Sequence, residues 1–393
     1  MPETLSASAV SLAEAAAATR SAPTRDLYID RLRVVMTALV VLHHCAITYG
    51  APGSWYYNEL HPSGSLSSFL LTIFVATNQA YFMGFFFLLA GYFTPRSLER
   101  KGYGWFIGDR FTRLGLPLLF YIVVLNPITD SVVAAAEGKP FWAVMAWHWN
   151  HMVIGTGPMW FVQALLMFTL AYCAWRAVAG PALHAPQIKK RVPSGGWWLL
   201  SALIVGAAAL AIRQVVPAGV NVIGLQLGYF ASYLFLFAIG IVARRNDWLN
   251  QLQWRHARAA LIAAFIAWPA LFVAIVLSGA IQGAKVNFGG GHTWPAILYA
   301  FWEPFVAWGL IAAWLLLFRS YVNTPSAFWK WLSRRAYTVY ILHPPVLVGV
   351  AVLLRPWAGP ALVKFGVTGT LACAAAWMIA DPLVRMPGLR RVV

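Results

Sequence analysis

The sequence predicts an all-α integral membrane protein, a polytopic bundle of about ten transmembrane helices with both termini in the cytoplasm. Three observations lead to this prediction. Hydrophobic residues make up 60% of the 393 residues and charged residues only 10%, whereas a soluble domain carries about 25% charged residues. The apolar residues recur in blocks of the roughly 20 residues that a helix needs to cross a bilayer. The basic residues fall in alternate connections between these blocks.

The apolar blocks define the expected domain organisation. We expect spans at roughly 33–50, 69–93, 114–136, 158–178, 197–212, 226–243, 257–280, 295–318, 336–354 and 360–384. They form one transmembrane domain over residues 28–386. Residues 1–27 are expected to be a disordered cytoplasmic tail without the basic and apolar regions of a cleavable signal peptide. Residues 387–393 form a short basic cytoplasmic tail.

The basic residues set the expected orientation. Of the 29 Lys and Arg, 24 lie in the two tails and in every second connection. The remaining five are Lys139, Arg213, Lys285 and Arg355 in the other connections, and Lys364 within the last span. Basic connections face the cytoplasm. The orientation is therefore N-in and C-in, in a multi-pass protein of the cell inner membrane.

Charge and cysteine usage exclude two other classes of site. A formal net charge of +17 in a soluble protein would indicate a nucleic-acid partner. Because the positive charge here lies beside apolar blocks, we assign it to anionic membrane lipids and expect no nucleic-acid partner. Cys45, Cys173 and Cys373 lie far apart in apolar blocks, so no metal site or disulfide framework is predicted.

The first span carries a polar pair. Arg33 lies at its cytoplasmic end, and His44 follows eleven residues later, about 16 Å deeper in a helix. Eleven residues bring the two side chains to within about 20° of one another around the helix axis. His43 is rotated by about 80°, so His44 is the better candidate for a joint site. The alternative is that both histidines only pack near the outer end of the span.

Arg110 and Arg113 open the third span three residues apart, on one side of a helix. Guanidinium groups bind phosphate oxygens well, so this pair is a candidate phosphate site. Taken by itself, the pair is more typical of a basic boundary at the cytoplasmic end of a span.

Glu303 lies inside the eighth apolar block, directly before Pro304. A buried carboxylate in a membrane needs a partner or a wet cavity, so Glu303 is a candidate functional residue or a bundle-stabilising one. Asp381 lies close to the cytoplasmic end of the last span and is expected to be structural.

The ninth span contains Tyr337, Tyr340 and His343 at intervals of three residues. Tyr340 and His343 are spaced to face one cavity. Tyr337, Tyr340 and His343 are candidate substrate-binding residues together with His43. Trp160, at the start of the fourth span, fits a belt of interfacial aromatic residues and is a further candidate, with Gln163 a weaker one. Gly91 follows an aromatic block and indicates a close approach between helices.

Several of these segments together resemble the membrane acyltransferase-3 family. Ten residues separate Arg33 from His44, as in its Arg-ten-His motif, and Arg110 with Arg113 resembles its paired-arginine motif. The other similar segments are Phe85 to Phe93, Met159 to Phe161, and Ser333 to Pro344. The chain has Arg31 where many members have glycine, and it lacks the hydrolase-like domain appended to some members, as do members that succinylate periplasmic glucans.

The resemblance implies a bundle of ten helices that O-acylates a glycan or lipid acceptor. It implies that the donor is an acyl-CoA, either acetyl-CoA or succinyl-CoA, which enters from the cytoplasm. No metal is expected. It makes His44 the central catalytic residue, with Arg33 beside it, and assigns the CoA phosphates to Arg110 and Arg113. Glu303 is expected to match an acidic residue on a late helix and to orient His44 if the two are close. Whether His44 is a general base or carries the acyl group stays open.

The main alternative is a proton-coupled transporter in which His44 and Glu303, with His343, form a relay. Transporters commonly consist of paired halves with interrupted helices, and the sequence shows no such internal symmetry. A scaffold or lipid-binding role is a third alternative.

Overall fold

The computed structural model describes residues 27–179, 189–389 and 392. Within these ranges the chain forms helices and no β-strand, and ten segments are long and apolar enough to cross a membrane. The prediction of an all-α polytopic membrane protein is therefore confirmed. Most of the expected N-terminal tail lies outside the described residues.

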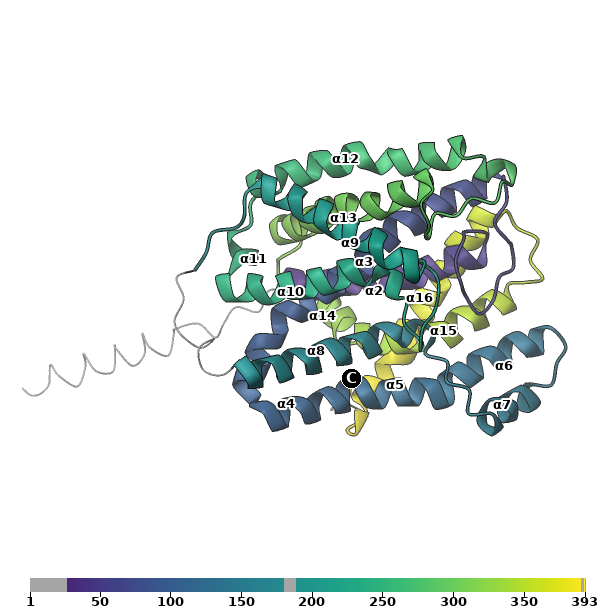
Figure 1. The fold of residues 1–393 in the computed structure, drawn as a ribbon. Coiled ribbons are helices and arrows are strands. Elements are labelled where there is room, and N and C mark those ends of the chain that lie inside the picture. The colour runs from purple at the N-terminus through teal and green to yellow at the C-terminus, as the bar shows by residue number, and fades with distance from the viewer. Residues whose placement is uncertain (1–26, 180–188, 390–391, 393) are drawn as a thin grey trace, which may run out of the picture.

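The helices follow one another along the chain as shown in Figure 1. They are α2 (Leu27–Thr48), α3 (Leu66–Lys101), α4 (Tyr103–Arg110), α5 (Leu116–Phe120), α6 (Asn126–Ala136), α7 (Phe141–Asn150), α8 (Trp160–Ala179), α9 (Gly195–Val215), α10 (Phe230–Asn246), α11 (Trp248–Gln251), α12 (Trp254–Leu277), α13 (Trp294–Tyr321), α14 (Ala327–Ser333), α15 (Ala336–Leu353) and α16 (Ala361–Arg385). The third span runs from α4 through α5 to α6 as one continuous segment, Tyr103–Ala136.

Two predicted boundaries need correction. The first span begins at Leu27, so Arg33 lies inside α2 and not at its start. The third span begins at Tyr103, so both Arg110 and Arg113 lie in helical backbone well inside it. Long basic side chains can bury their stems and keep their charge in water, so a helix continues past the point where the apolar block ends.

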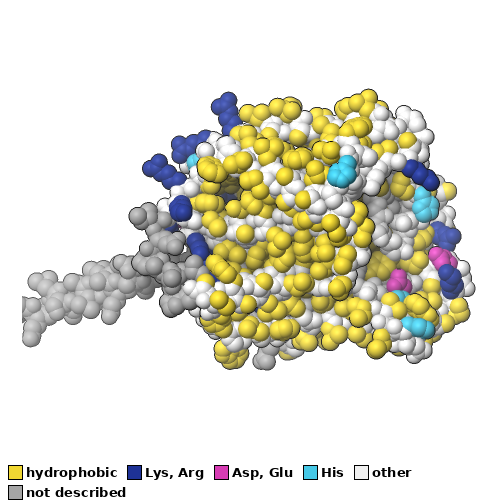
Figure 2. Space-filling view, in the orientation of Figure 1, with side chains coloured by type: hydrophobic (Ala, Val, Ile, Leu, Met, Phe, Trp, Pro, Cys, Tyr) yellow, Lys and Arg dark blue, Asp and Glu magenta, His cyan; other side chains and the backbone are white. Residues whose placement is uncertain are grey.

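The central helices α2, α3 and α13 have the largest share of buried residues among the ten spans, and α9, α12 and α16 have the smallest. In Figure 2 a broad hydrophobic belt covers the visible side of the bundle, and Lys and Arg side chains gather at its left end. We call this end, which holds the junction of α3 and α4, the basic face. The other end holds loops 49–65 and 278–293 and is called the opposite face.

Gly91 lies where α3 and α10 cross, as its sequence context predicted. A β-carbon at Gly91 would overlap the carbonyl of Phe237, and one at Gly240 would overlap the carbonyl of Leu88. Each helix therefore contributes a glycine to the crossing, and the two backbones come into direct contact.

The third span is an irregular helix. It contains two π-helical turns, 111–115 and 121–125, and each lies just before a proline, Pro117 and Pro127. Proline has no N–H for the carbonyl four residues earlier. The turns release main-chain carbonyls, and in a membrane each one needs another donor.

Candidate active site

His44 lies in the last turns of α2, within a stack of aromatic rings. The indole of Trp55 lies almost parallel to it, with ring centres 4.0 Å apart and planes 16° apart. His343 of α15 lies 5.5 Å from His44 with planes 17° apart. His43 meets His44 edge-on at 5.4 Å and stacks on Phe82 of α3. Three imidazoles therefore meet at this point, two from α2 and one from α15. The cluster forms only when the two helices pack together.

His343 is held in one orientation by the proline that follows it. Pro344 cannot donate to the carbonyl of Tyr340, and Nδ1 of His343 lies 2.5 Å from that carbonyl oxygen. A carbonyl only accepts, so Nδ1 carries the hydrogen, and in the neutral ring Nε2 holds a free lone pair. Nε2 is buried and meets no hydrogen-bond partner among the described residues. His343 is therefore an oriented acceptor at the centre of the bundle.

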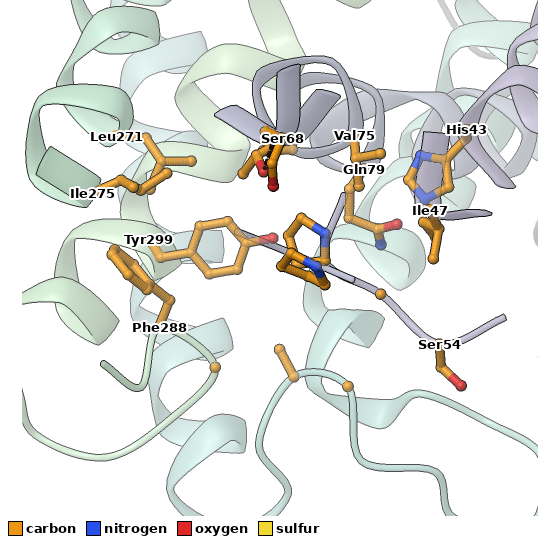
Figure 3. Close-up of a pocket in the computed structure, with 18 of the residues that line it drawn as sticks. His43, Ile47, Ser54, Ser68, Val75, Gln79, Leu271, Ile275, Phe288 and Tyr299 are labelled. Atoms are coloured by element: carbon orange, nitrogen blue, oxygen red, sulfur yellow. Dashed lines mark hydrogen bonds between the residues drawn. The ribbon is translucent and has the colours of Figure 1, made fainter. Parts of the chain in front are cut away.

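A cavity of about 810 Å³ adjoins this cluster. His43, His44, Tyr340 and Trp160 line its inner end, and its rim consists of loops at the opposite face. Figure 3 shows His43 projecting into this space from α2. The volume falls within the range of small-molecule sites, so a sizeable substrate can reach the histidines from the opposite face.

The two predicted phosphate-binding arginines share one carboxylate. Asp109 accepts from Arg110 at 2.5 Å and from Arg113 at 3.0 Å, and Lys101 lies 2.7 Å away. Three cations around one anion leave an excess of positive charge at the basic face. The Asp109 carboxylate occupies the geometry that a phosphate oxygen could take.

Tyr337 joins this basic cluster to α15. Its hydroxyl donates to the Arg113 carbonyl at 2.6 Å, which is the carbonyl released by Pro117. Arg33 pairs with Asp30, one turn earlier on α2, at 3.9 Å. The hydrogen bond of Tyr337 places the arginine-bearing part of the third span beside α15.

A short path along α15 connects the basic cluster to the histidines. Tyr337, Tyr340 and His343 follow at intervals of three residues and rise about 9 Å in total. The Tyr340 hydroxyl donates to the carbonyl of Pro158, at the start of the fourth span. Predicted residues from four spans, far apart in sequence, are thus brought together.

Glu303 does not meet His44. Its carboxylate forms a buried ion pair with Arg213 of α9, so the expected orienting contact is wrong. Arg213 also donates to the Gly228 carbonyl at 2.9 Å and lies between the rings of Tyr229 and Tyr299, with centres 5.2 and 5.0 Å away. Both tyrosines line the cavity, so the ion pair supports the cavity wall from behind.

Sequence reasoning assigned Arg213 to an outer connection, because the fifth span seemed to end at residue 212. The helix continues to Val215, and Arg213 is only 1% exposed. The pairing could have been suspected, since Glu303 needed a buried cation and Arg213 stood at the edge of a short span. Trp55 was also missed, because it lies in a loop without periodicity.

The remaining candidates have defined surroundings. Trp160 stacks on Tyr233 of α10 at 5.5 Å, and Gln163 donates to the carbonyl of Ile223. Asp381 pairs with Arg335 and with Arg385. It is therefore in a structural network, as predicted.

Comparisons with known proteins agree with the sequence motifs. Residues 26–381 match the acyltransferase-3 model, described as an acyltransferase domain. The chain is 20% identical over 386 residues to the glucans biosynthesis protein C of Salmonella typhi, Salmonella typhimurium strain LT2 and Salmonella heidelberg. Each comparison covers 93% of this chain and 94% of the relative. No solved structure matches the chain.

Proposed function

Since the chain belongs to the acyltransferase-3 family and is a membrane acyltransferase, we propose that it moves an acetyl or succinyl group from acyl-CoA to a hydroxyl of an envelope glycan. His44 is the catalytic imidazole. The observation that carries the proposal is the position of His44, between a cavity open at one face and a basic cluster at the other.

The basic cluster is the proposed site for the donor. Arg110 and Arg113 have a geometry that suits phosphate oxygens, and Arg33 of α2 completes the proposed site. Following the positive-inside rule, we propose that the basic face lies on the cytoplasmic side of the inner membrane, where acyl-CoA is made. With its phosphates at Arg113, the extended pantetheine arm follows Tyr337 and Tyr340 toward His44.

The proposed reaction forms an ester and releases the CoA thiol. The acceptor oxygen attacks the thioester carbonyl carbon, the C–S bond breaks, and the hydroxyl proton passes through the His44 imidazole to the leaving sulfur. In the covalent alternative, the acyl group is first transferred to His44 and then to the acceptor. In both cases Trp55 stacks on the His44 ring, and the His343 ring lies beside them both.

The acceptor class is supported by the relatives. The three Salmonella proteins are named for glucan biosynthesis, and the cavity opens at the face opposite the proposed donor site. A glycan hydroxyl that approaches from the periplasm would reach the histidines through this opening.

The test uses the purified protein in nanodiscs with radiolabelled acetyl-CoA or succinyl-CoA and periplasmic glucan. We expect labelled ester in the glucan, and none with His44→Ala. The control is His151→Ala, because His151 is exposed directly after α7 and does not line the cavity. Normal turnover in His44→Ala would reject the catalytic role. A rapid-quench experiment that finds labelled protein only when His44 is present would support the covalent route.

The transporter alternative loses its proposed relay, because Glu303 is paired with Arg213. It predicts solute flux without labelled ester. That flux can be measured with the same purified protein reconstituted in liposomes.

A further inference from the structure

The cavity has an apolar arm that acyl transfer to a free sugar would not use. We define the arm by Phe69 and Ala76 of α3, Leu271 and Ile275 of α12, and Phe288. Figure 3 shows Leu271, Ile275 and Phe288 at one end of the cavity and His43 at the other, with Gln79 and Tyr299 between them. The arm and the histidines belong to one continuous space of about 810 Å³.

The length of the cavity follows from α3. Ser68, Thr72, Val75, Gln79 and Phe82 all line it and recur at intervals of three or four residues, so one face of α3 borders the cavity throughout. Fourteen residues of helix extend about 21 Å. A molecule whose hydroxyl lies beside His43 and His44 therefore has room to extend a second part along α3.

The arm lies against the last two turns of α12. Val273, Val276 and Leu277 of α12 point outward and are exposed, as expected for side chains in contact with lipid, whereas Leu271 and Ile275 turn toward the cavity. One to two turns earlier on α12, the indole of Trp268 donates to Thr77 at 2.9 Å and connects α12 to α3. The arm therefore lies on the inner side of a helix whose outer side is apolar.

The chemistry of the two ends is different. Gln79, Tyr299 and His43 offer hydrogen-bonding groups that suit a sugar. The five arm residues offer none from their side chains. The hydroxyls of Ser68 and Thr72, which border the arm on α3, already donate to the main-chain carbonyls of Gly50 and Ser68. An apolar space does not retain water but does bind hydrocarbon, and burying each methylene group stabilises a complex by about 0.8 kcal/mol.

We propose that the preferred acceptor is amphipathic. It is a hydroxyl compound, such as a glycolipid or lipid-linked sugar, whose hydrocarbon chain lies in the apolar arm while its hydroxyl faces His44. This rests on the proposed acyl transfer and narrows its substrate class. The arm is continuous with the mouth at the opposite face, so its occupant enters there. The donor's phosphate site is at the basic face.

The first experiment measures acyl transfer in nanodiscs to methyl, butyl, hexyl and octyl β-glucosides, with radiolabelled acyl-CoA as the donor. Each added methylene raises kcat/KM by about fourfold while the chain fills the arm. Longer glucosides also partition more strongly into the nanodisc lipid, which raises kcat/KM in a similar way. The chain-length dependence is therefore compared between two variants. Ile275→Trp fills the arm, and Val276→Trp adds the same side chain on the lipid-facing side.

We expect the octyl-to-methyl ratio of kcat/KM to be at least tenfold higher in the wild type and in Val276→Trp than in Ile275→Trp. The same ratio in all three proteins overturns the proposal and leaves acyl transfer standing. A second result also overturns the proposal. If kcat/KM rises with the length of the CoA's acyl group and not with the glucoside chain, and Ile275→Trp abolishes that rise, the arm holds the donor's chain.

A binding readout separates this proposal from the transfer reaction. An octyl glucoside with a photoreactive diazirine at its chain end is cross-linked to the wild type and to His44→Ala. Labelled peptides from residues 66–83 and 271–288, displaced by unlabelled octyl glucoside, support the arm even if no acceptor is acylated. Labelling that is confined to the outward-facing residues of α12, and that unlabelled octyl glucoside does not displace, contradicts the proposal. This readout does not depend on the two tryptophan variants.

Discussion

The hydroxyl of Tyr337 donates a hydrogen bond to the main-chain carbonyl of Arg113, 2.6 Å away, across two spans. Pro117 deprives this carbonyl of its helical donor. The bond therefore satisfies a polar group inside the bundle and fixes the part of the third span that carries Arg110 and Arg113.

Replacing Tyr337 by phenylalanine removes only this donor. A hydrogen bond contributes about 1 kcal/mol, so we expect the KM for acyl-CoA to rise about fivefold while kcat changes little. The measurement is a donor titration in nanodiscs. Tyr321→Phe is the control, because Tyr321 is exposed at the end of α13. An unchanged KM together with a reduced kcat would show that Tyr337 acts at the reacting centre and not on the donor site.

Trp55 holds the ring of His44 in place from the loop that follows α2. With the indole removed, His44 loses the face on which it stacks at 4.0 Å, and we expect Trp55→Ala to lower kcat at least tenfold. Trp55→Phe keeps an aromatic face and should recover much of the rate. Trp142→Ala, on the exposed side of α7, should have no effect. If Trp55→Phe is as inactive as Trp55→Ala, stacking is not the reason for the loss.

The two ring nitrogens of His343 have separate roles, which an asparagine and a leucine substitution can distinguish. Asparagine places a donor near the position of Nδ1 and can keep the bond to the Tyr340 carbonyl, but it has no counterpart of Nε2. We therefore expect His343→Asn to keep wild-type thermal stability and lose most activity, whereas His343→Leu loses both. Activity in His343→Asn close to that of the wild type would show that Nε2 has no part in the reaction.

Gly91 permits the contact between α3 and α10, and alanine there has no room. Its β-carbon would overlap the carbonyl of Phe237, and overpacking of this kind costs about 1–3 kcal/mol. We expect Gly91→Ala to lower the melting temperature in detergent by several degrees. Gly366→Ala in α16 is the matched control, since nothing lies near its added carbon and alanine favours a helix. Equal melting temperatures would contradict the close crossing.

Much of this architecture could be predicted from the sequence because the bilayer limits the alternatives. Apolar blocks gave ten spans and Gly91 gave a close crossing. The positions of Arg33 and His44 on α2, and of Arg110 and Arg113 on the third span, follow from helical periodicity alone. Contacts between spans were harder to predict, because a side chain in one span gives no sign of its partner in another.

Prolines within the spans indicate where side-chain donors are needed. Pro117, Pro127 and Pro344 each release a carbonyl four residues earlier, and side chains supply the missing donors: Tyr337, Trp149 and His343. In a membrane each such carbonyl needs a partner, so a proline within a span predicts that a donor exists. Only the folded chain shows which residue provides it.

Arg213 and Glu303 test whether the buried acid is structural or catalytic. Glu303→Gln leaves a guanidinium that is 1% exposed without its counter-charge, and breaking a buried pair from one side costs about 3–5 kcal/mol. We expect this variant to lose most folded protein. Replacing both residues by methionine removes both charges and should restore the folded yield, because an apolar pair of similar volume is often as stable. Restored activity in the double variant means that Glu303 supports the wall of the cavity. A folded but inactive double variant would instead return Glu303 to the catalytic machinery, with Tyr229 and Tyr299 as the route by which it reaches the substrate.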